Sequence, residues 1–107
     1  MSCLLYTSDT GDSFGFALGH GDINSDGYGD LIVSAASYSY PKVSCGKVYT
    51  YFGGSNVNTT SLWNITGNHS GEMLGYRLLG NVDVNGDGYM DIVASAPFNA
   101  SNNGTVY

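Results

Sequence analysis

The stretch DINSDGYGD at residues 22–30 recurs as DVNGDGYMD at residues 83–91, and both follow the pattern D-x-N-x-D-G-x-x-D. Acidic and amide side chains at alternate positions of a short loop converge on one point. A hard divalent cation such as Ca²⁺ takes about six to eight oxygen ligands at roughly 2.3–2.6 Å, and the glycine at the sixth position allows the sharp turn. Asn, Asp and Gly also favour simple turns, but a turn does not require a carboxylate at the ninth position. The pattern therefore predicts two calcium loops.

Each predicted loop supplies five oxygen ligands, four from side chains and one from the main-chain carbonyl of a tyrosine. The first set is Asp22, Asn24, Asp26 and Asp30 with the carbonyl of Tyr28, and the second is Asp83, Asn85, Asp87 and Asp91 with the carbonyl of Tyr89. Six of the nine acidic residues lie in these loops, so most of the net charge of −6 is local. Two Ca²⁺ ions per chain would relieve the repulsion between the three carboxylates of each loop.

The remaining composition excludes several classes of function. Only three residues are Lys or Arg, so the chain lacks the basic patch that nucleic acid or an anionic membrane surface requires. No apolar run approaches the roughly 20 residues of a membrane span, which predicts no direct membrane insertion. His20 and His69 are the only histidines, and neither lies in a recognisable catalytic motif. We expect that the chain is not an enzyme.

The repeat extends beyond the loops, with a period of about 60 residues. Residues 10–15 align with 70–75, residues 30–36 with 91–97, and residues 46–49 with 104–107. The segments are short, rich in β-branched and aromatic residues, and bounded by Gly, Asn, Ser or Pro, which is typical of strands. In the first repeat the expected strands are Phe14–Gly19, Leu31–Ala36, Gly46–Phe52 and Ser61–Thr66. The sequence therefore predicts an all-β fold of four-stranded antiparallel meanders, with a metal loop joining the first two strands.

The strand that follows each loop argues against an EF-hand, which places a bidentate Glu at its twelfth position on an emerging helix. The twelfth positions here are Val33 and Ala94, both in apolar, strand-like segments.

The chain resembles two FG-GAP repeats, the blades of the β-propeller at the head of integrin α subunits. Phe14-Gly15 matches the FG element, the two acidic loops match the calcium site of that family, and Ser95-Ala96-Pro97 matches the GAP element. Leu74 stands where Phe is usual, Ala36 where Pro is usual, and a Ser where the first Gly of GAP is usual. The resemblance implies a calcium-binding extracellular module for adhesion or ligand binding.

Two other functions stay open at this point. One is a carbohydrate-binding propeller, in which Trp63 and Phe52 would stack on sugars, although such aromatic residues are also expected in the core between blades. The other is a non-catalytic accessory of a secreted enzyme, as in the propeller of glycosylphosphatidylinositol-specific phospholipase D. In each case the expected ligand is an extracellular protein or a glycan.

The repeat alignment divides the chain into residues 1–13, an outer strand of a preceding blade, residues 14–67, the first repeat, and residues 68–107, the second repeat without its last strand. A propeller generally needs about four to eight blades. The chain is therefore expected either to form a ring of identical copies by strand exchange between blades, or to be a piece of a larger propeller.

Extracellular or cell-surface localisation is expected, because extracellular calcium modules work at about 10⁻⁴–10⁻³ M calcium. Five N-glycosylation sequons, starting at Asn58, Asn64, Asn68, Asn99 and Asn103, are compatible with a glycoprotein. Cys3 and Cys45 allow either one disulfide or two free thiols.

Overall fold

The computed structural model describes residues 11–55, 63–98 and 103–107 and contains two antiparallel sheets. The first sheet has the strands β1 (Phe14–Gly21), β2 (Asp30–Ala35), β3 (Lys47–Tyr51) and β4 (Trp63–Thr66), in the order β1-β2-β3-β4. Each strand pairs with its neighbour in the sequence, so the predicted four-stranded meander is confirmed. Among the described residues the observed strand ends differ from the expected ones by no more than two residues, and the expected start of the fourth strand at Ser61 lies outside them.

The second sheet repeats the first three strands of this arrangement. It consists of β5 (Leu78–Val82), β6 (Asp91–Ala96) and β7 (Thr105–Val106), in the order β5-β6-β7. β7 pairs with Ser95 and Ala96 at the end of β6. The loop between β1 and β2 and the loop between β5 and β6 therefore occupy the same place in the two sheets.

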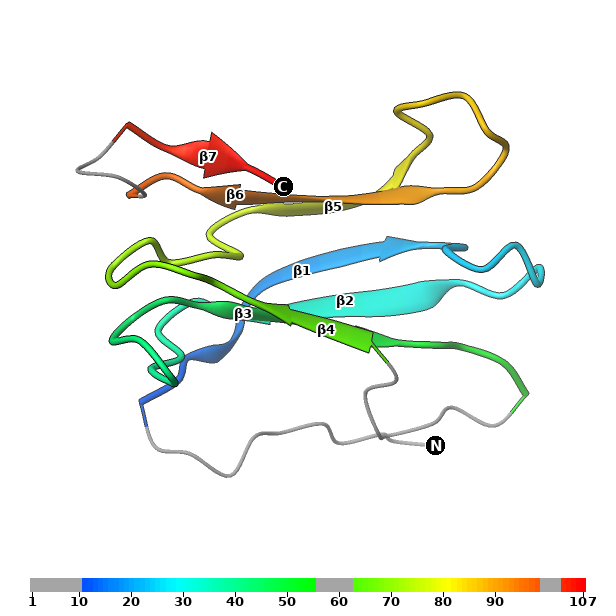
Figure 1. The fold of residues 1–107 in the computed structure, drawn as a ribbon. Coiled ribbons are helices and arrows are strands. Elements are labelled where there is room, and N and C mark those ends of the chain that lie inside the picture. Colours follow the sequence, from blue (N-terminus) through cyan, green and yellow to red (C-terminus); the bar gives the residue numbers. More distant parts are fainter. Residues whose placement is uncertain (1–10, 56–62, 99–102) are drawn as a thin grey trace.

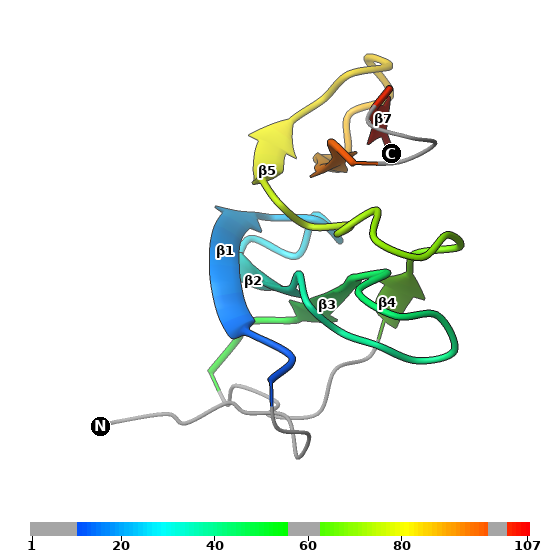
Figure 2. The same cartoon turned by 90° about the vertical axis from the view of Figure 1, so that its left-hand side faces the viewer.

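The two sheets lie face to face as layers (Figure 1). β1 and β5 lie next to each other at one edge of the layers (Figure 2), and the two acidic loops project from the same end of the sheets (Figure 1). Five buried residues form the core between the layers, namely Ile32, Val48, Leu74, Ala94 and Ala96. This is the packing expected of neighbouring propeller blades, in which each sheet buries its apolar face against the next.

Glycines allow close contact between the two layers at the edge formed by β1 and β5. A Cβ atom built on Gly21 would lie 1.6 Å from the carbonyl oxygen of Gly80, so only glycine fits where β1 meets β5. Gly46 forms a parallel bridge with Leu74, and the two sheets are thus also connected through the segment that precedes β5. Close main-chain packing and the apolar core therefore both contribute to the contact between the sheets.

An aromatic cluster stabilises the first sheet. The ring of Phe14 packs edge-on against Tyr49 and Tyr51, with centroids 5.4 and 6.5 Å apart. Such pairs add about 0.5–1.5 kcal/mol beyond the area they bury. Tyr51 is 5% exposed, and this burial raises the pKa of its hydroxyl above the ordinary value of 10.0.

This pKa shift predicts a loss of stability at high pH. The unfolded chain ionises Tyr51 near pH 10, whereas the folded chain resists ionisation, so the stabilisation is complete below about pH 10 and is lost as the pH rises through the folded pKa. Urea unfolding between pH 8 and 11 should show this fall, and Tyr51→Phe should reduce its steepness. The same fall in the variant would contradict the assignment to Tyr51.

Within the described ranges, no helix is long and apolar enough to cross a membrane.

Candidate metal centres

The first acidic loop is organised around Asp22, which follows the end of β1. Its carboxylate accepts hydrogen bonds from the main-chain N–H groups of Asp26 (3.0 Å) and Gly27 (2.8 Å). Asp26 in turn accepts from the N–H of Tyr28 at 2.9 Å. Ser25 and Gly27 have left-handed φ angles of 58° and 86°, which the turn requires and which glycine adopts at no steric cost. The loop folds back so that its acidic residues lie on a common turn.

Asp30 closes the loop at its base, as the first residue of β2. Only 2% of its surface is exposed, and both carboxylate oxygens accept main-chain hydrogen bonds. Oδ2 accepts from Ile23 N (2.8 Å) within the loop, and Oδ1 accepts from Gly53 N (2.9 Å) just beyond β3. A buried carboxylate needs such partners because an uncompensated charge away from water is costly. Asp30 therefore connects the loop, β2 and the end of β3.

The second loop repeats most of these hydrogen bonds at equivalent positions. Asp83 accepts from the N–H groups of Gly86 (2.8 Å), Asp87 (3.1 Å) and Gly88 (2.9 Å). Asp87 accepts from Tyr89 N (2.9 Å), and Oδ2 of Asp91 accepts from Val84 N (2.8 Å). The two loops thus share one local geometry.

The structure brings together part of each predicted ligand set. Asp22 and Asp26 share one hydrogen-bonded turn, as do Asp83 and Asp87, and Asp30 and Asp91 lie at the bases of the loops. Asn24 is exposed on the first loop, and Asn85 contacts Asp87 through its Oδ1. Across the described part of the chain, no three His, Cys, Asp or Glu side chains form a group that would hold a metal ion.

The chemistry of the donors nevertheless fits a hard cation. Each loop presents three carboxylates and one amide on a turn of nine residues, and the main-chain bonds occupy only part of their lone pairs. Carboxylate and amide oxygens are the ligands that Ca²⁺ prefers, and its coordination geometry is flexible. Three carboxylates repel one another at short range, so bringing the full set together would require a cation between them.

Sequence reasoning did not identify two polar connections near the loops. One is the bond from Gly53 to Asp30, which joins residues far apart in the chain. The other surrounds Glu72, which is fully buried and accepts from Asn68 N (2.7 Å), with His69 Nδ1 at 3.2 Å and the hydroxyl of Tyr107 at 3.5 Å. The alignment of Glu72 with Asp12, both buried acids, is the sequence signal for this connection.

Burial raises the pKa of Tyr107, and the nearby charge of Glu72 and the hydrogen bond to it raise this pKa further. The neutral hydroxyl of Tyr107 is therefore the form that reaches Glu72, which links β7 to the turn before β5.

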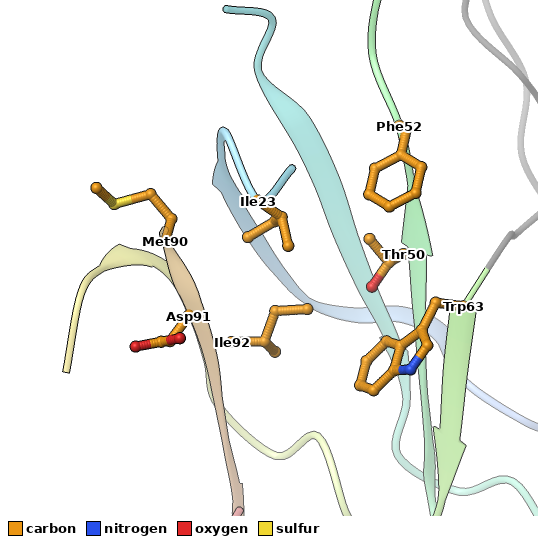
Figure 3. A pocket seen from close by; sticks show the side chains of 7 residues that line it. All are labelled: Ile23, Thr50, Phe52, Trp63, Met90, Asp91 and Ile92. Carbon is orange, nitrogen blue, oxygen red and sulfur yellow. The ribbon is translucent and has the colours of Figure 1, made fainter. Parts of the chain in front are cut away.

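Other residues named from the sequence are not among the candidate ligands. Trp63 and Phe52 line a pocket between the sheets, and Ile23, Met90 and Asp91 of the acidic loops line it too (Figure 3). Cys45 is a buried free thiol whose Sγ lies 3.5 Å from the carbonyl oxygen of Tyr38. Cys3 lies outside the described residues.

Comparison with known proteins agrees with this architecture. The FG-GAP repeat pattern matches residues 14–54 and 76–107. Integrin alpha-PS2 of Drosophila melanogaster is 34% identical over 91% of this chain and 8% of its own length. Phosphatidylinositol-glycan-specific phospholipase D of Homo sapiens is 41% identical over 79% of the chain and 10% of its own length.

Integrin alpha-7 of Mus musculus is 34% identical over 88% of the chain. The chain spans only about a tenth of the length of these relatives. The matched ranges contain β1 to β3, β5 to β7 and both acidic loops, in the order that the structure shows. The chain therefore belongs to the FG-GAP repeat family, and is a propeller-blade module related to integrin alpha chains and to phosphatidylinositol-glycan-specific phospholipase D.

Proposed function

We propose that the chain is a calcium-stabilised, non-catalytic module of an extracellular or cell-surface protein, used for adhesion or ligand binding. The observation that supports this most is the repetition of one hydrogen-bonded frame in two acidic loops at the same end of adjacent sheets. A turn alone would not need three carboxylates held in the same way twice. The sequons and the relationship to integrin alpha chains are compatible with an extracellular site of action.

Calcium would act on the hairpin that joins the first two strands of each blade. In the first loop Asp22, Asn24, Asp26 and Asp30 would hold the ion, with the carbonyl of Tyr28. In the second loop the equivalent ligands would be Asp83, Asn85, Asp87, Asp91 and the carbonyl of Tyr89. The bound ion supplies positive charge between the carboxylates, while the main-chain hydrogen bonds orient them.

Calcium should raise the melting temperature of the chain. At a free concentration ten times the Kd, each ion stabilises the folded state by about 1.4 kcal/mol, which corresponds to roughly 6–11 °C for a domain of this size. Calorimetric titration should give two ions per chain, and a chelator should reverse the stabilisation. An unchanged melting temperature with and without calcium would contradict the structural role of the ion.

Isosteric variants assign the ions to the loops. Asp26→Asn should reduce the stoichiometry from two ions to one, and the double variant with Asp87→Asn should abolish binding, because each change removes one ligand charge. Both aspartates are exposed. The amide oxygen of each Asn variant can still accept the main-chain hydrogen bond from Tyr28 or Tyr89. Asn64→Gln, on the exposed side of β4, is the matched control and should bind two ions.

An accessory role in an enzyme is the second candidate, because the relatives of the chain include phospholipases in addition to integrins. The module itself is proposed to be non-catalytic in either case. Phosphatidylinositol-glycan hydrolysis by the purified chain would contradict this. Adhesion of cells to immobilised chain, sensitive to chelator, would favour the adhesive role.

A ring of identical chains, formed by exchange of the N-terminal strand, is proposed as one way to complete the propeller. Most of that strand, residues 1–10, lies outside the described residues. Light scattering should give three or four copies per particle, corresponding to six or eight blades, and a well-folded monomer would contradict the ring.

A further inference from the structure

The second acidic loop, yellow to orange in Figure 1, contains the pair Asn85-Gly86. In an Asn-Gly pair the main-chain nitrogen of the glycine can attack the side-chain amide of the asparagine, and glycine has no Cβ atom to hinder the attack. The attack closes a ring within the chain, so no second reactant has to be brought to the site. Both residues of the pair are exposed. The loop therefore carries a nucleophile and an electrophile as neighbours.

The side-chain carbonyl of Asn85 already accepts a main-chain hydrogen bond. Its Oδ1 lies 3.2 Å from the N–H of Asp87, which also donates to Asp83 Oδ1 at 3.1 Å. Attack on the amide carbon Cγ places negative charge on Oδ1, and a donor that is aimed at this oxygen beforehand stabilises the charge. The turn thus activates the amide of Asn85 for attack.

The nitrogen of Gly86 has a proton acceptor in contact with it. Its N–H donates to Asp83 Oδ1 at 2.8 Å, which lies within the roughly 2.6–3.2 Å that proton transfer requires. A main-chain amide nitrogen is a weak nucleophile until its proton is withdrawn, and the carboxylate of Asp83 is placed to withdraw it. The acceptor, the nucleophile and the activated carbonyl therefore belong to one turn.

The first loop lacks this combination. Ser25 stands where the second loop has Gly86, and it carries a side chain next to the nitrogen that would have to attack. Asp22 accepts from the N–H groups of Asp26 and Gly27, and within the described part of the chain it accepts no bond from Ser25. Asn24 is therefore expected to be stable where Asn85 is not.

Asn103-Gly104 is a second Asn-Gly pair and provides a reference within the same chain. Asn103 is exposed, as Asn85 is. Across residues 11–55, 63–98 and 103–107, the N–H of Gly104 bonds to no carboxylate. The two pairs thus share the dipeptide and differ in the proton acceptor.

We propose that Asn85 is a site of self-modification, at which the second acidic loop converts its own asparagine to aspartate and isoaspartate. The nitrogen of Gly86 forms a bond to Cγ of Asn85, and the bond from Cγ to Nδ2 breaks. The proton of Gly86 passes through Asp83 to the departing nitrogen, which leaves as ammonia, and a cyclic imide remains. A solvent water molecule then opens the imide at either carbonyl, and no electrons are gained or lost.

The two products change the loop in different ways. Aspartate adds a fourth carboxylate to the three that the turn already carries. Isoaspartate routes the main chain through the side-chain carbon, which lengthens it by one methylene and displaces the N–H groups that Asp83 binds. The reaction rests on the hydrogen bonds of the loop alone, and only the effect of calcium described below rests on the proposed function.

Comparison of the folded and the unfolded chain provides the first test. The chain is incubated with chelator, in buffer or in urea, and peptide mapping by mass spectrometry follows modification at Asn85 and Asn103 in the same samples. In urea both Asn-Gly pairs should react at similar rates. In the folded chain Asn85 should react at least about tenfold faster than Asn103, which is a small part of the roughly 10²–10⁴ that a positioned general base contributes. The same ratio of rates in buffer and in urea would overturn the proposal.

Two variants separate the contributions of the loop. Asp83→Asn removes the proton acceptor and should slow modification of Asn85 at least about tenfold, with the rate at Asn103 unchanged. Gly86→Ser gives the second loop the residue of the first, where Ser25 adopts the same left-handed φ, so the turn is retained while the attack is hindered. Circular dichroism checks that both variants fold. A folded Asp83→Asn variant that reacts as fast as the parent chain would overturn the proposal.

Calcium should protect Asn85, because the proposed ligands Asp83 and Asn85 would direct their oxygens to the ion. At a free concentration ten times the Kd, about one loop in eleven is without the ion, so modification of Asn85 should slow about tenfold. The rate at Asn103 should not change. Equal rates at Asn85 with and without calcium would contradict calcium binding by these two residues, whereas faster reaction of Asn85 in the folded chain with chelator would still support self-modification.

Discussion

Leu74→Ala should lower the free energy of unfolding by about 2–5 kcal/mol, since it removes a fully buried side chain from the centre of the core between the two sheets. Leu74 also lies in the segment that connects the sheets, where its N–H bonds to the carbonyl of Cys45 (3.0 Å) and its main chain bridges Gly46. The surrounding main chain is therefore fixed and has little freedom to collapse into the cavity. This loss is a large fraction of the stability of a typical small domain, about 5–15 kcal/mol.

Urea unfolding followed by tryptophan fluorescence and by circular dichroism measures this loss. Leu18→Ala is the matched control, because Leu18 is 64% exposed and its truncation should change stability by less than about 0.5 kcal/mol. If the two variants lose the same amount, Leu74 does not hold the sheets together as the structure indicates.

Gly21→Ala should destabilise the chain by about 3 kcal/mol or more, which is the upper range for forcing extra atoms into a packed interior. The added methyl group would overlap the carbonyl oxygen of Gly80 at 1.6 Å, and the obstacle is main chain, so no side-chain rotation relieves it. β1 and β5 would have to separate at the edge where they lie side by side (Figure 2). The strain arises from this contact and not from the conformation of Gly21 itself.

Gly29→Ala is the control for the same chemical change. A Cβ atom at Gly29 meets nothing within 4 Å, and alanine reduces the entropy of the unfolded chain, so its effect should lie within about 1 kcal/mol of zero. Both variants should be measured with chelator present, since Gly29 belongs to an acidic loop. Comparable losses in the two variants would contradict the close approach of β1 and β5.

The sequence predicted the strands of the first sheet well because their signals are local. Short segments rich in β-branched and aromatic residues, bounded by Gly, Asn, Ser or Pro, identified β1 to β3 and the described part of β4 to within one or two residues. The repeat then carried the same arrangement to β5, β6 and β7. The FG-GAP family also followed from short motifs, and the comparisons confirmed it.

The candidate loops were only partly predictable. The acidic pattern located both turns, and the structure shows the carboxylates bound to the main-chain N–H groups of these turns. The acidic pattern did not predict the hydrogen bond from Gly53 N to Asp30. That bond joins residues that only the pairing of β2 with β3 brings together. Calcium binding itself stays a prediction for calorimetry.

Leu74 illustrates the other limit of sequence reasoning. The sequence presents it as a departure from the usual Phe of the FG element, whereas the structure places it at the junction of the two sheets. Its importance depends on neighbours from β2, β3 and β6, which no local pattern specifies.

The sequence alone thus determined the all-β class, the family, the repeat and the position of the acidic loops, because each depends on residue types at short, regular spacing. Only the tertiary structure decided where the sheets touch and which aspartate is buried. These properties depend on distances between residues far apart in the chain, and such distances are set by the packing of one sheet on the other.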